Sequence, residues 1–320
     1  MKAICVAEFG GPDVMQIKDR PDLSAGEGQI LISVKAVGVN PVDTYIREGW
    51  YPIKKPSGYT PGFDAAGLVE QVGRGVESFR PGDRVFVCGS LTGTYAEQTL
   101  CLPKQVFALP DKVSFSQGAA LGTPYGTACQ ALFGRADAQA GQTVLVHGAS
   151  GGVGIAAVQL AAAGGLTVFA TAGTDKGRQL VTERGARHAL DHHDAGHFEA
   201  VKELTDGRGV DIVLEMLANV NLDRDLDILA SGGSVVVIGS RGRIEIDPRK
   251  TMARDLNILG MSLMNASTEQ RAAIYARIQA GLEAGQLSPV IGQELPLEKA
   301  PEAHRLVMES AHYGKIVLIP

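Results

Sequence analysis

The chain has 320 residues, more than one ordinary hydrophobic core accommodates, and its length predicts two domains. Its content of 45% hydrophobic and 20% charged residues is typical of a globular protein. The net charge of −5 argues against a general nucleic-acid-binding surface, which needs an excess of Lys and Arg. No window approaches the ~18 apolar residues of a membrane span, and the N-terminus has no apolar signal region. We therefore expect a cytoplasmic protein.

The first 116 residues contain short β-rich runs separated by turns. Examples are 30–37, 67–72 and 83–87, with turn signals at 10–12 and 81–83. This pattern predicts a compact antiparallel β domain.

From residue 117 onward, apolar strands alternate with helices. We expect strands at 143–146, 166–171, 188–190, 210–214, 234–238 and 256–260, and helices at 155–163, 176–184 and 223–229. This alternation predicts an α/β fold with a doubly wound parallel sheet, covered by helices on both faces. A long helix at 268–284 and a last strand at 315–319 depart from the alternation, which indicates that the chain returns to its first domain.

The glycine-rich segment Gly148–Gly154 lies between the first strand of this region and its first helix. That context makes a glycine pattern a dinucleotide-binding hypothesis. Ala149, Gly151 and Gly154 have the fingerprint spacing, with alanine in the first glycine position. Gly151 would let the backbone approach a pyrophosphate, and Gly154 would let the helix pack closely on the strand. The N–H groups at the start of the helix would bind the phosphates; a tight turn without a ligand is the alternative.

The end of the second strand bears on the choice between NADPH and NADH. An NAD site usually has an acidic residue there, which binds the ribose 2′-hydroxyl. Here the corner 172–174 is small and uncharged, and Lys176 and Arg178 follow it. These cations would attract a 2′-phosphate, so the pattern favours NADPH. Asp175 is expected to point outward as a helix cap, and a solvated helix face is the alternative for the two cations.

Six segments resemble the zinc-free quinone oxidoreductase branch of the medium-chain dehydrogenase/reductase superfamily, which includes zeta-crystallin. They are 8–12, 38–47, 61–67, 147–154, 215–222 and 239–242. The resemblance implies a GroES-like catalytic domain (1–116 and 261–320) around a central Rossmann domain (117–260). It also implies that cofactor and substrate meet in the cleft between these two domains. It also implies a homodimer or homotetramer in which the last Rossmann strands of two copies pair.

By matched position, the resemblance implies a set of contacts to NADPH. These residues are Tyr45, Ser150, Gly151, Gly152, Val153, Gly173, His192, Asn221, Ile238, Gly239, Ser240, Arg241, Met261, Ser262 and Leu263. Lys176 is added from its own position. Some bacterial relatives carry a lysine one residue later, where this chain has Gly177, so the resemblance leaves the partner of the 2′-phosphate open. His192 can equally be read as part of an exposed pair with His193. Glu215 is expected to orient the loop 218–221, and His147 to be structural.

The sequence predicts no metal. The four cysteines are scattered, without the close pairs of a structural zinc site. The zinc alcohol dehydrogenases of the superfamily have ligands where this chain has Asn40 and Phe63, so three catalytic ligands cannot be assembled. The neighbouring Asp64 is expected to bond the backbone of its turn. Hydride transfer without a Lewis acid favours a reactive acceptor, such as a quinone or an α,β-unsaturated carbonyl.

Asn40, Tyr45 and Tyr51 are the candidates for the acceptor pocket, and no general acid is assigned. Asn40 could donate a hydrogen bond to a carbonyl oxygen, and Tyr45 could donate one or stack on a ring. For Tyr51, packing is the stronger alternative. The leading hypothesis is therefore an NADPH-dependent quinone reductase.

Three other functions stay open. The first is an NADPH-dependent alkenal or enone double-bond reductase, and the second is a non-catalytic, crystallin-like NADPH-binding protein. The third is nucleic-acid binding, supported only by a basic cluster that acidic residues dilute. That cluster consists of Arg241, Arg243, Arg249, Lys250 and Arg254.

Overall fold

The computed structural model describes residues 1–51, 58–309 and 313–320, and the chain forms two compact units. Unit 1 comprises Met1–Thr123 and Ser288–Pro320, and unit 2 comprises Pro124–Leu287. Within the described residues, no helix is long and apolar enough to cross a membrane.

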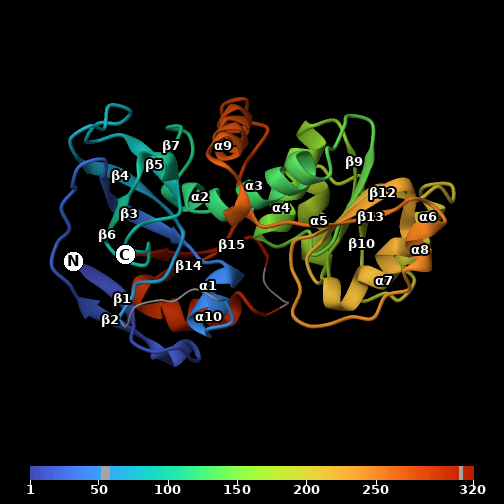
Figure 1. The fold of residues 1–320 in the computed structure, drawn as a ribbon, viewed down its shortest axis with the longest axis horizontal. Helices are drawn as coiled ribbons and strands as arrows, with labels where there is room; N and C mark the ends of the chain where they lie inside the picture. The colour runs from blue at the N-terminus through green and yellow to red at the C-terminus, as the bar shows by residue number, and fades with distance from the viewer. Residues whose placement is uncertain (52–57, 310–312) are drawn as a thin grey trace. The chain divides into compact units, whose positions relative to one another are not determined.

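Unit 1 is built on a seven-stranded sheet of order β14-β15-β3-β4-β5-β7, with β6 paired to β3 (Figure 1). The strands are β3 (Ile30–Gly38), β4 (Asp64–Val72), β5 (Arg84–Cys88), β6 (Gln98–Cys101), β7 (Val106–Ala108), β14 (Ile291–Pro296) and β15 (Lys315–Ile319). Every pair is antiparallel except β14 with β15. A hairpin of β1 (Lys2–Val6) and β2 (Met15–Asp19), and the helices α1 (Pro41–Arg47), α2 (Phe115–Gly118) and α10 (Ala300–Leu306), complete the unit.

Unit 2 contains a six-stranded parallel sheet of order β10-β9-β8-β11-β12-β13. The strands are β8 (Thr143–Val146), β9 (Thr167–Thr171), β10 (His188–Leu190), β11 (Val210–Glu215), β12 (Leu229–Val237) and β13 (Asn257–Gly260). This order is that of the doubly wound dinucleotide-binding fold. The predicted Rossmann sheet is therefore confirmed.

Helices cover both faces of this parallel sheet (Figure 1). α4 (Gly152–Ala163) and α5 (Asp175–Glu183) lie on one face, and α6 (His197–Glu203) and α7 (Ala218–Ile228) on the other. The remaining helices are α3 (Gly122–Cys129), α8 (Arg249–Met252) and α9 (Thr268–Glu283). Because the connections from β8 and β11 leave in opposite directions along the sheet, the carboxyl ends of these two strands form its switch point.

The unit boundaries differ from the expected 116/117 and 260/261. Unit 2 extends to Leu287 because α9 packs within it: a side chain at Gly126 would lie 2.7 Å from the hydroxyl of Tyr275. The chain returns to unit 1 at Ser288, and its last strand, β15, pairs with β3 there.

Two elements begin earlier than the sequence predicts. α7 starts at Ala218 rather than 223, and β12 at Leu229 rather than 234. No proline or capping side chain marks the start of α7, and two glycines interrupt the apolar run of β12. Sheet pairing with β11 extends β12 across these glycines.

Candidate functional site

The loops expected to bind a dinucleotide all leave the same edge of the parallel sheet. Val146 of β8 pairs with Ala170 of β9 and with Leu214 of β11, and Glu215 pairs with Val237 of β12, so the four strands end at one level. The next residues of these four loops include Ser150–Val153, Gly173, Asn221 and Ile238–Arg241. The structure therefore brings these expected cofactor residues to one edge.

The glycine loop has the geometry that the fingerprint requires. Gly148 adopts a φ of +57°, which a glycine takes without strain. A Cβ at Gly154 would lie 2.4 Å from the carbonyl oxygen of Gly148, so only glycine lets α4 start this close to the loop. At Gly151 the nearest atom would be 3.5 Å away, which leaves the space in front of the helix open to a ligand. Gly151 caps α4 without a side chain, and the first N–H groups of the helix lie beside that space.

The corner after β9 holds the cations expected to select a 2′-phosphate. Arg178 pairs with Asp175 and, at 2.9 Å, with Asp191, so its charge is already compensated. Lys176 is exposed at the start of α5. The expected cap role of Asp175 is wrong, because the side chain of Thr174 caps α5 by accepting a hydrogen bond from the N–H of Gly177.

Gly173 lies against the two histidines that follow β10. A Cβ at Gly173 would lie 2.5 Å from Nε2 of His192 and 2.6 Å from Nε2 of His193. Burial lowers the pKa of His192, with the neighbouring His193 adding to the effect. A neutral imidazole beside a glycine corner can present a flat face to an adenosine group.

Glu215 ends β11 and organises the loop that follows. Its Oε1 accepts hydrogen bonds from the N–H of Leu217 and, at 3.4 Å, from Nδ2 of Asn221. Its backbone carbonyl accepts the N–H of Ile238 at 2.9 Å. The expected role of Glu215 in orienting this loop is thus seen in its hydrogen bonds. Asn219, in the first turn of α7, accepts the N–H of Arg241 at 2.8 Å, which joins the start of α7 to the loop after β12.

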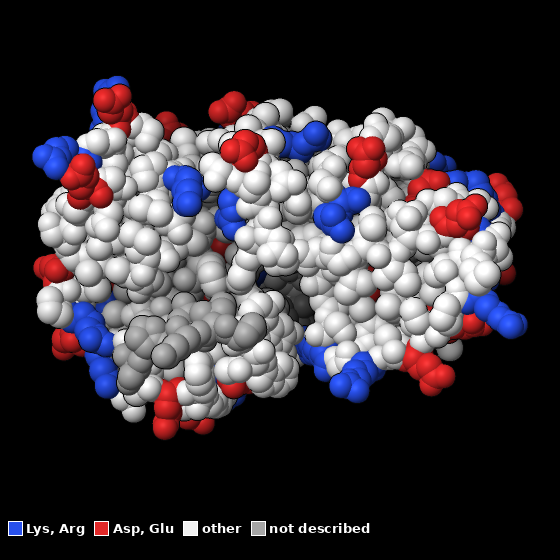
Figure 2. All heavy atoms as spheres, viewed as in Figure 1, with Lys and Arg blue, Asp and Glu red and all other residues white. Residues whose placement is uncertain are grey.

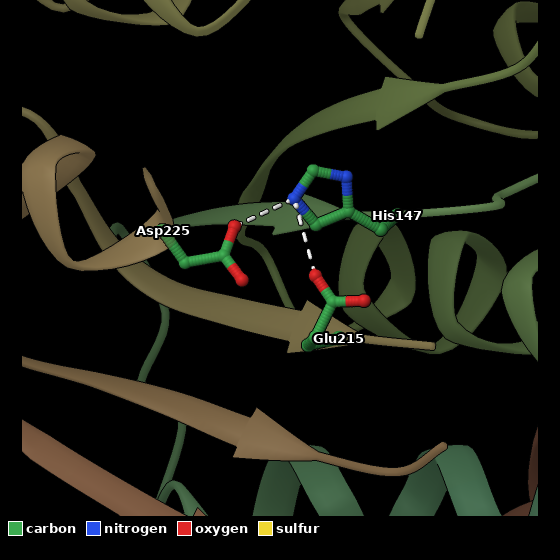
Figure 3. A group of neighbouring side chains, drawn as sticks. All are labelled: His147, Glu215 and Asp225. Atoms are coloured by element: carbon green, nitrogen blue, oxygen red, sulfur yellow. Dashed lines mark hydrogen bonds and ion pairs between the residues drawn. The ribbon is translucent and has the colours of Figure 1, made fainter. Parts of the chain in front are cut away.

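Three buried titratable side chains, His147, Glu215 and Asp225, point toward one another (Figure 3). His147 follows β8, Glu215 ends β11, and Asp225 comes from α7. Nε2 of His147 is 2.9 Å from Oδ1 of Asp225 and 3.6 Å from Oε2 of Glu215. All three are buried, so the trio joins the glycine loop, the following loop and α7 inside the unit.

Burial shifts the pKa of each member of the trio toward its neutral form. It raises the pKa of Glu215 to about 8, with the charge of Asp225 adding to the effect, and that of Asp225 to about 7. It lowers the pKa of His147. At neutral pH Glu215 is therefore largely protonated, and Asp225 is partly protonated.

The trio was missed as a unit by sequence reasoning, which singled out only two of its members. Asp225 lies between Leu222 and Leu226 on the buried face of α7, and an acid on an apolar stripe is the signal that could have found it. One imidazole nitrogen and two carboxylate oxygens lie within 4.8 Å of one another, and these are atoms that divalent metals accept. The expectation of a chain without metal stays a prediction.

In unit 1, Asn40 is tied to its neighbours. Its Nδ2 donates to Oδ2 of Asp64 at 2.9 Å, and its Oδ1 accepts from Nζ of Lys315. Asp64 also accepts from the N–H and hydroxyl of Thr123 at 2.9 and 2.7 Å. Asn40 is only 3% exposed and its amide is engaged within unit 1. Its expected role as a donor to a carbonyl oxygen stays a prediction.

The two tyrosines of the expected acceptor pocket lie at and just beyond the end of α1. Tyr45 is half-buried in the last turn of the helix, and its ring stacks on that of Trp50. Tyr51 is 38% exposed. The structure therefore leaves part of each tyrosine ring accessible in unit 1.

The last expected contacts, Met261, Ser262 and Leu263, follow β13. The N–H of Met261 donates to the carbonyl of Val237 at 3.1 Å, so this segment begins beside the end of β12. Leu263 is buried, whereas Ser262 is exposed. These residues lie in unit 2, together with the glycine loop.

Comparison with known proteins identifies the family. Residues 26–111 match the alcohol dehydrogenase GroES-like domain, and residues 152–277 match the zinc-binding dehydrogenase family. Quinone oxidoreductase of Rattus norvegicus is 48% identical over 321 residues, which cover 100% of this chain and 98% of the relative. The chain belongs to the quinone oxidoreductase family. The resemblance to this branch of the medium-chain dehydrogenase/reductase superfamily is thereby confirmed.

Solved structures extend the comparison to the fold. Escherichia coli quinone oxidoreductase, complexed with NADPH, is 30% identical with a TM-score of 0.90, and each chain covers 100% of the other. An NAD-dependent alcohol dehydrogenase, also 30% identical with full coverage, has a TM-score of 0.93. The expected combination of a Rossmann and a GroES-like domain is thus confirmed for this member of the quinone oxidoreductase family.

Two members of the basic cluster behind the nucleic-acid alternative, Lys250 and Arg254, are engaged with neighbouring groups. Nζ of Lys250 lies 2.6 Å from Asp223 and 2.8 Å from Asp227, and Arg254 donates to backbone carbonyls of α7 and β12. Basic and acidic side chains are also interspersed over the face drawn in Figure 2. Such a distribution does not make the continuous positive surface that nucleic-acid binding needs.

Proposed function

We propose that this protein reduces quinones with NADPH. The observation that carries the reaction is the 48% identity over the whole chain to a quinone oxidoreductase. The glycine loop supports the cofactor, because Gly151 leaves space for a pyrophosphate in front of α4 and Gly154 lets the helix approach. Bound NADPH would supply a hydride equivalent from its nicotinamide ring.

The residues of unit 2 would bind the different groups of the cofactor at successive positions along the sheet edge. The N–H groups at the start of α4 bind the pyrophosphate, and Gly173 with His192 accommodates the adenosine. Lys176, which is exposed at the start of α5, is the cation proposed for the 2′-phosphate, and Arg178 pairs with two carboxylates. Glu215 positions Asn221 in the first turn of α7, which starts beside the switch point where the nicotinamide end of a dinucleotide is expected.

The proposed reaction needs no metal ion. In the two-electron form, NADPH, one quinone and one proton give NADP⁺ and a hydroquinone, and the proton comes from solvent because no general acid is assigned. Phe63 and Asn40 stand where zinc alcohol dehydrogenases of the superfamily place ligands. Nζ of Lys315 lies 3.7 Å from Asp64, and this buried ammonium makes the same place unfavourable for a metal dication.

An acceptor panel under steady-state conditions tests the proposal. We expect NADPH oxidation with 1,4-benzoquinone and 1,4-naphthoquinone, and unchanged rates after dialysis against a chelator. A higher kcat/KM with an alkenal or enone would favour the double-bond reductase instead. NADPH binding without turnover on any acceptor would favour the non-catalytic alternative, and loss of turnover on chelation would contradict the metal-free reaction.

A further inference from the structure

The buried side chain of Thr171, at the end of β9, supports the glycine loop of unit 2. Its Oγ1 accepts a hydrogen bond from the N–H of Gly148 at 3.2 Å. Its backbone carbonyl accepts the N–H of Ala149 at 2.8 Å. One residue of the neighbouring strand therefore binds two successive N–H groups of the loop, and the first of these bonds depends on the hydroxyl group.

The same hydroxyl group also contacts the imidazole of His147. Oγ1 of Thr171 lies 3.4 Å from Nδ1 of His147. Because the N–H of Gly148 already donates to Oγ1, the hydroxyl hydrogen remains available to be donated to Nδ1. Nδ1 can accept it only without a proton of its own. A neutral imidazole in this arrangement therefore carries its proton on Nε2.

The groups around the other ring nitrogen favour the same tautomer. Nε2 of His147 lies 2.9 Å from Oδ1 of Asp225 and 3.6 Å from Oε2 of Glu215 (Figure 3). Two carboxyl groups thus face Nε2, whereas a hydroxyl group faces Nδ1. Since a carboxyl oxygen accepts a hydrogen bond from an imidazole N–H, a proton on Nε2 satisfies both sides of the ring.

We propose that Asp225 and His147 are positioning residues for the nucleotide, which orient the Thr171 hydroxyl so that it holds the glycine loop in its binding geometry. The inference rests on the proposed NADPH binding. Asp225 accepts from His147, His147 accepts from Thr171, and Thr171 accepts from Gly148. A hydrogen-bond chain of one direction thus runs from α7 past the ends of β8 and β9 to the loop. Both residues act through Thr171.

Substitutions in β9 test the last bond of this chain. Thr171→Val keeps the shape of the side chain and removes the hydroxyl, whereas Thr171→Ser retains it. We expect Thr171→Val to raise the Kd of NADPH and of NADH by the same factor of about three to ten, because both nucleotides have the pyrophosphate that the loop would bind. Thr171→Ser should restore the wild-type affinities. Thr167→Val, in the same strand, is the matched control and should also leave them unchanged.

Steady-state kinetics separate this positioning role from a loss of folded protein. A displaced loop weakens nucleotide binding without removing a group that takes part in the reaction. The KM for NADPH in Thr171→Val should therefore rise, while kcat at saturating NADPH stays at the wild-type value. A lower kcat with unchanged KM and Kd would mean a merely structural role and would overturn the inference. Absence of nucleotide binding by the wild type would instead overturn the proposed function.

NMR of the histidine ring nitrogens tests the other end of the chain without any nucleotide. The signals of His147 are assigned by their loss in His147→Gln. We expect a neutral ring with its proton on Nε2 at neutral pH, since burial lowers the pKa of His147. Asp225→Leu, which keeps a branched side chain but removes the acceptor, should lower the population of this tautomer and weaken NADPH binding. A proton on Nδ1 in the wild type would overturn the inference, as would a wild-type Kd in folded Asp225→Leu.

Discussion

Glu215 links the interior of unit 2 to the loops at its sheet edge. Its Oε1 orients Leu217 and Asn221, and its Oε2 faces His147. Burial raises its pKa from 4.5 to about 8, so the folded protein holds a proton there that the unfolded chain has already released at neutral pH. The same side chain therefore orients the loop after β11 and makes the stability of the protein depend on pH.

The free energy of unfolding should fall as pH rises from 6.5 to 8. In this window the folded state binds more protons than the unfolded state at Glu215, so raising the pH favours unfolding. His147 acts in the opposite direction wherever its imidazole is still protonated in the unfolded chain, which holds for half of the molecules at pH 6.5 and about one in ten at pH 7.5. Calorimetric melting curves across this range measure the slope.

Glu215→Gln removes the acid while keeping a hydrogen-bond acceptor for the loop. We expect its pH slope over the same range to be clearly smaller than that of the wild type. The exposed Glu203→Gln serves as the matched control and should retain the wild-type slope. An unchanged slope in Glu215→Gln would contradict a buried, protonated carboxyl at this position.

At the level of single residues, the sequence located the glycine corner but not the buried networks. Glu215 and His147 drew notice because each follows an apolar strand, whereas Asp225 is ten positions further along and belongs to the trio only through the packing of α7. Likewise, Asn40 and Lys315 are 275 residues apart, and their contact arises from the pairing of β15 with β3. Local sequence patterns carry no signal for such contacts.

The start of α4 is the element on which the proposed cofactor binding depends. Substitutions of two glycines there should have different effects. In Gly154→Ala the new Cβ would lie 2.4 Å from the carbonyl oxygen of Gly148, so the helix must shift. We expect a loss of about 1–3 kcal/mol in stability together with weaker NADPH binding. Thermal melting and equilibrium titration measure the two effects.

In Gly151→Ala the new Cβ meets no atom closer than 3.5 Å, so folding should be preserved. It would nevertheless occupy the space through which a pyrophosphate approaches the helix. We expect an NADPH affinity at least tenfold lower, with a melting temperature near that of the wild type. Equal NADPH affinities of Gly151→Ala and the wild type would contradict pyrophosphate binding at this loop.

The elements themselves were largely predictable because each has a strong local signal. The apolar, valine-rich run 144–146 predicts a buried strand, and the alanine-rich composition of α4 predicts a helix. The early starts of α7 and β12 were not predictable, because sheet pairing and loop hydrogen bonds determine them.

For the whole molecule, the exposed edge of the unit 2 sheet bears on assembly. β13 pairs only with β12 in the described sheet, and Ile258 on it is 39% exposed. An unprotected edge strand can pair with a second copy, and we expect a dimer or tetramer of the 33.6-kDa chain. Sedimentation equilibrium should show this assembly, and Ile258→Lys should shift it toward the monomer; a wild-type monomer would contradict the prediction.

The two-unit organisation was predictable in outline, because the change from turn-separated β runs to alternating strands and helices is visible in the sequence. Its second boundary was not. α9 has exposed and buried positions like any surface helix. Contacts such as Tyr275 against α3 and Arg277 over the ring of Phe133 assign it to unit 2. Such an assignment depends on contacts across about 150 residues of chain.

The central claim is that a 2′-phosphorylated dinucleotide binds at the glycine corner of unit 2. Calorimetric titration of the purified protein with NADPH and with NADH tests it most directly, with Lys176→Ala measured alongside. We expect NADPH to bind at least tenfold more tightly than NADH, and Lys176→Ala to reduce that ratio. Equal affinities for the two nucleotides, or no NADPH binding, would contradict the account.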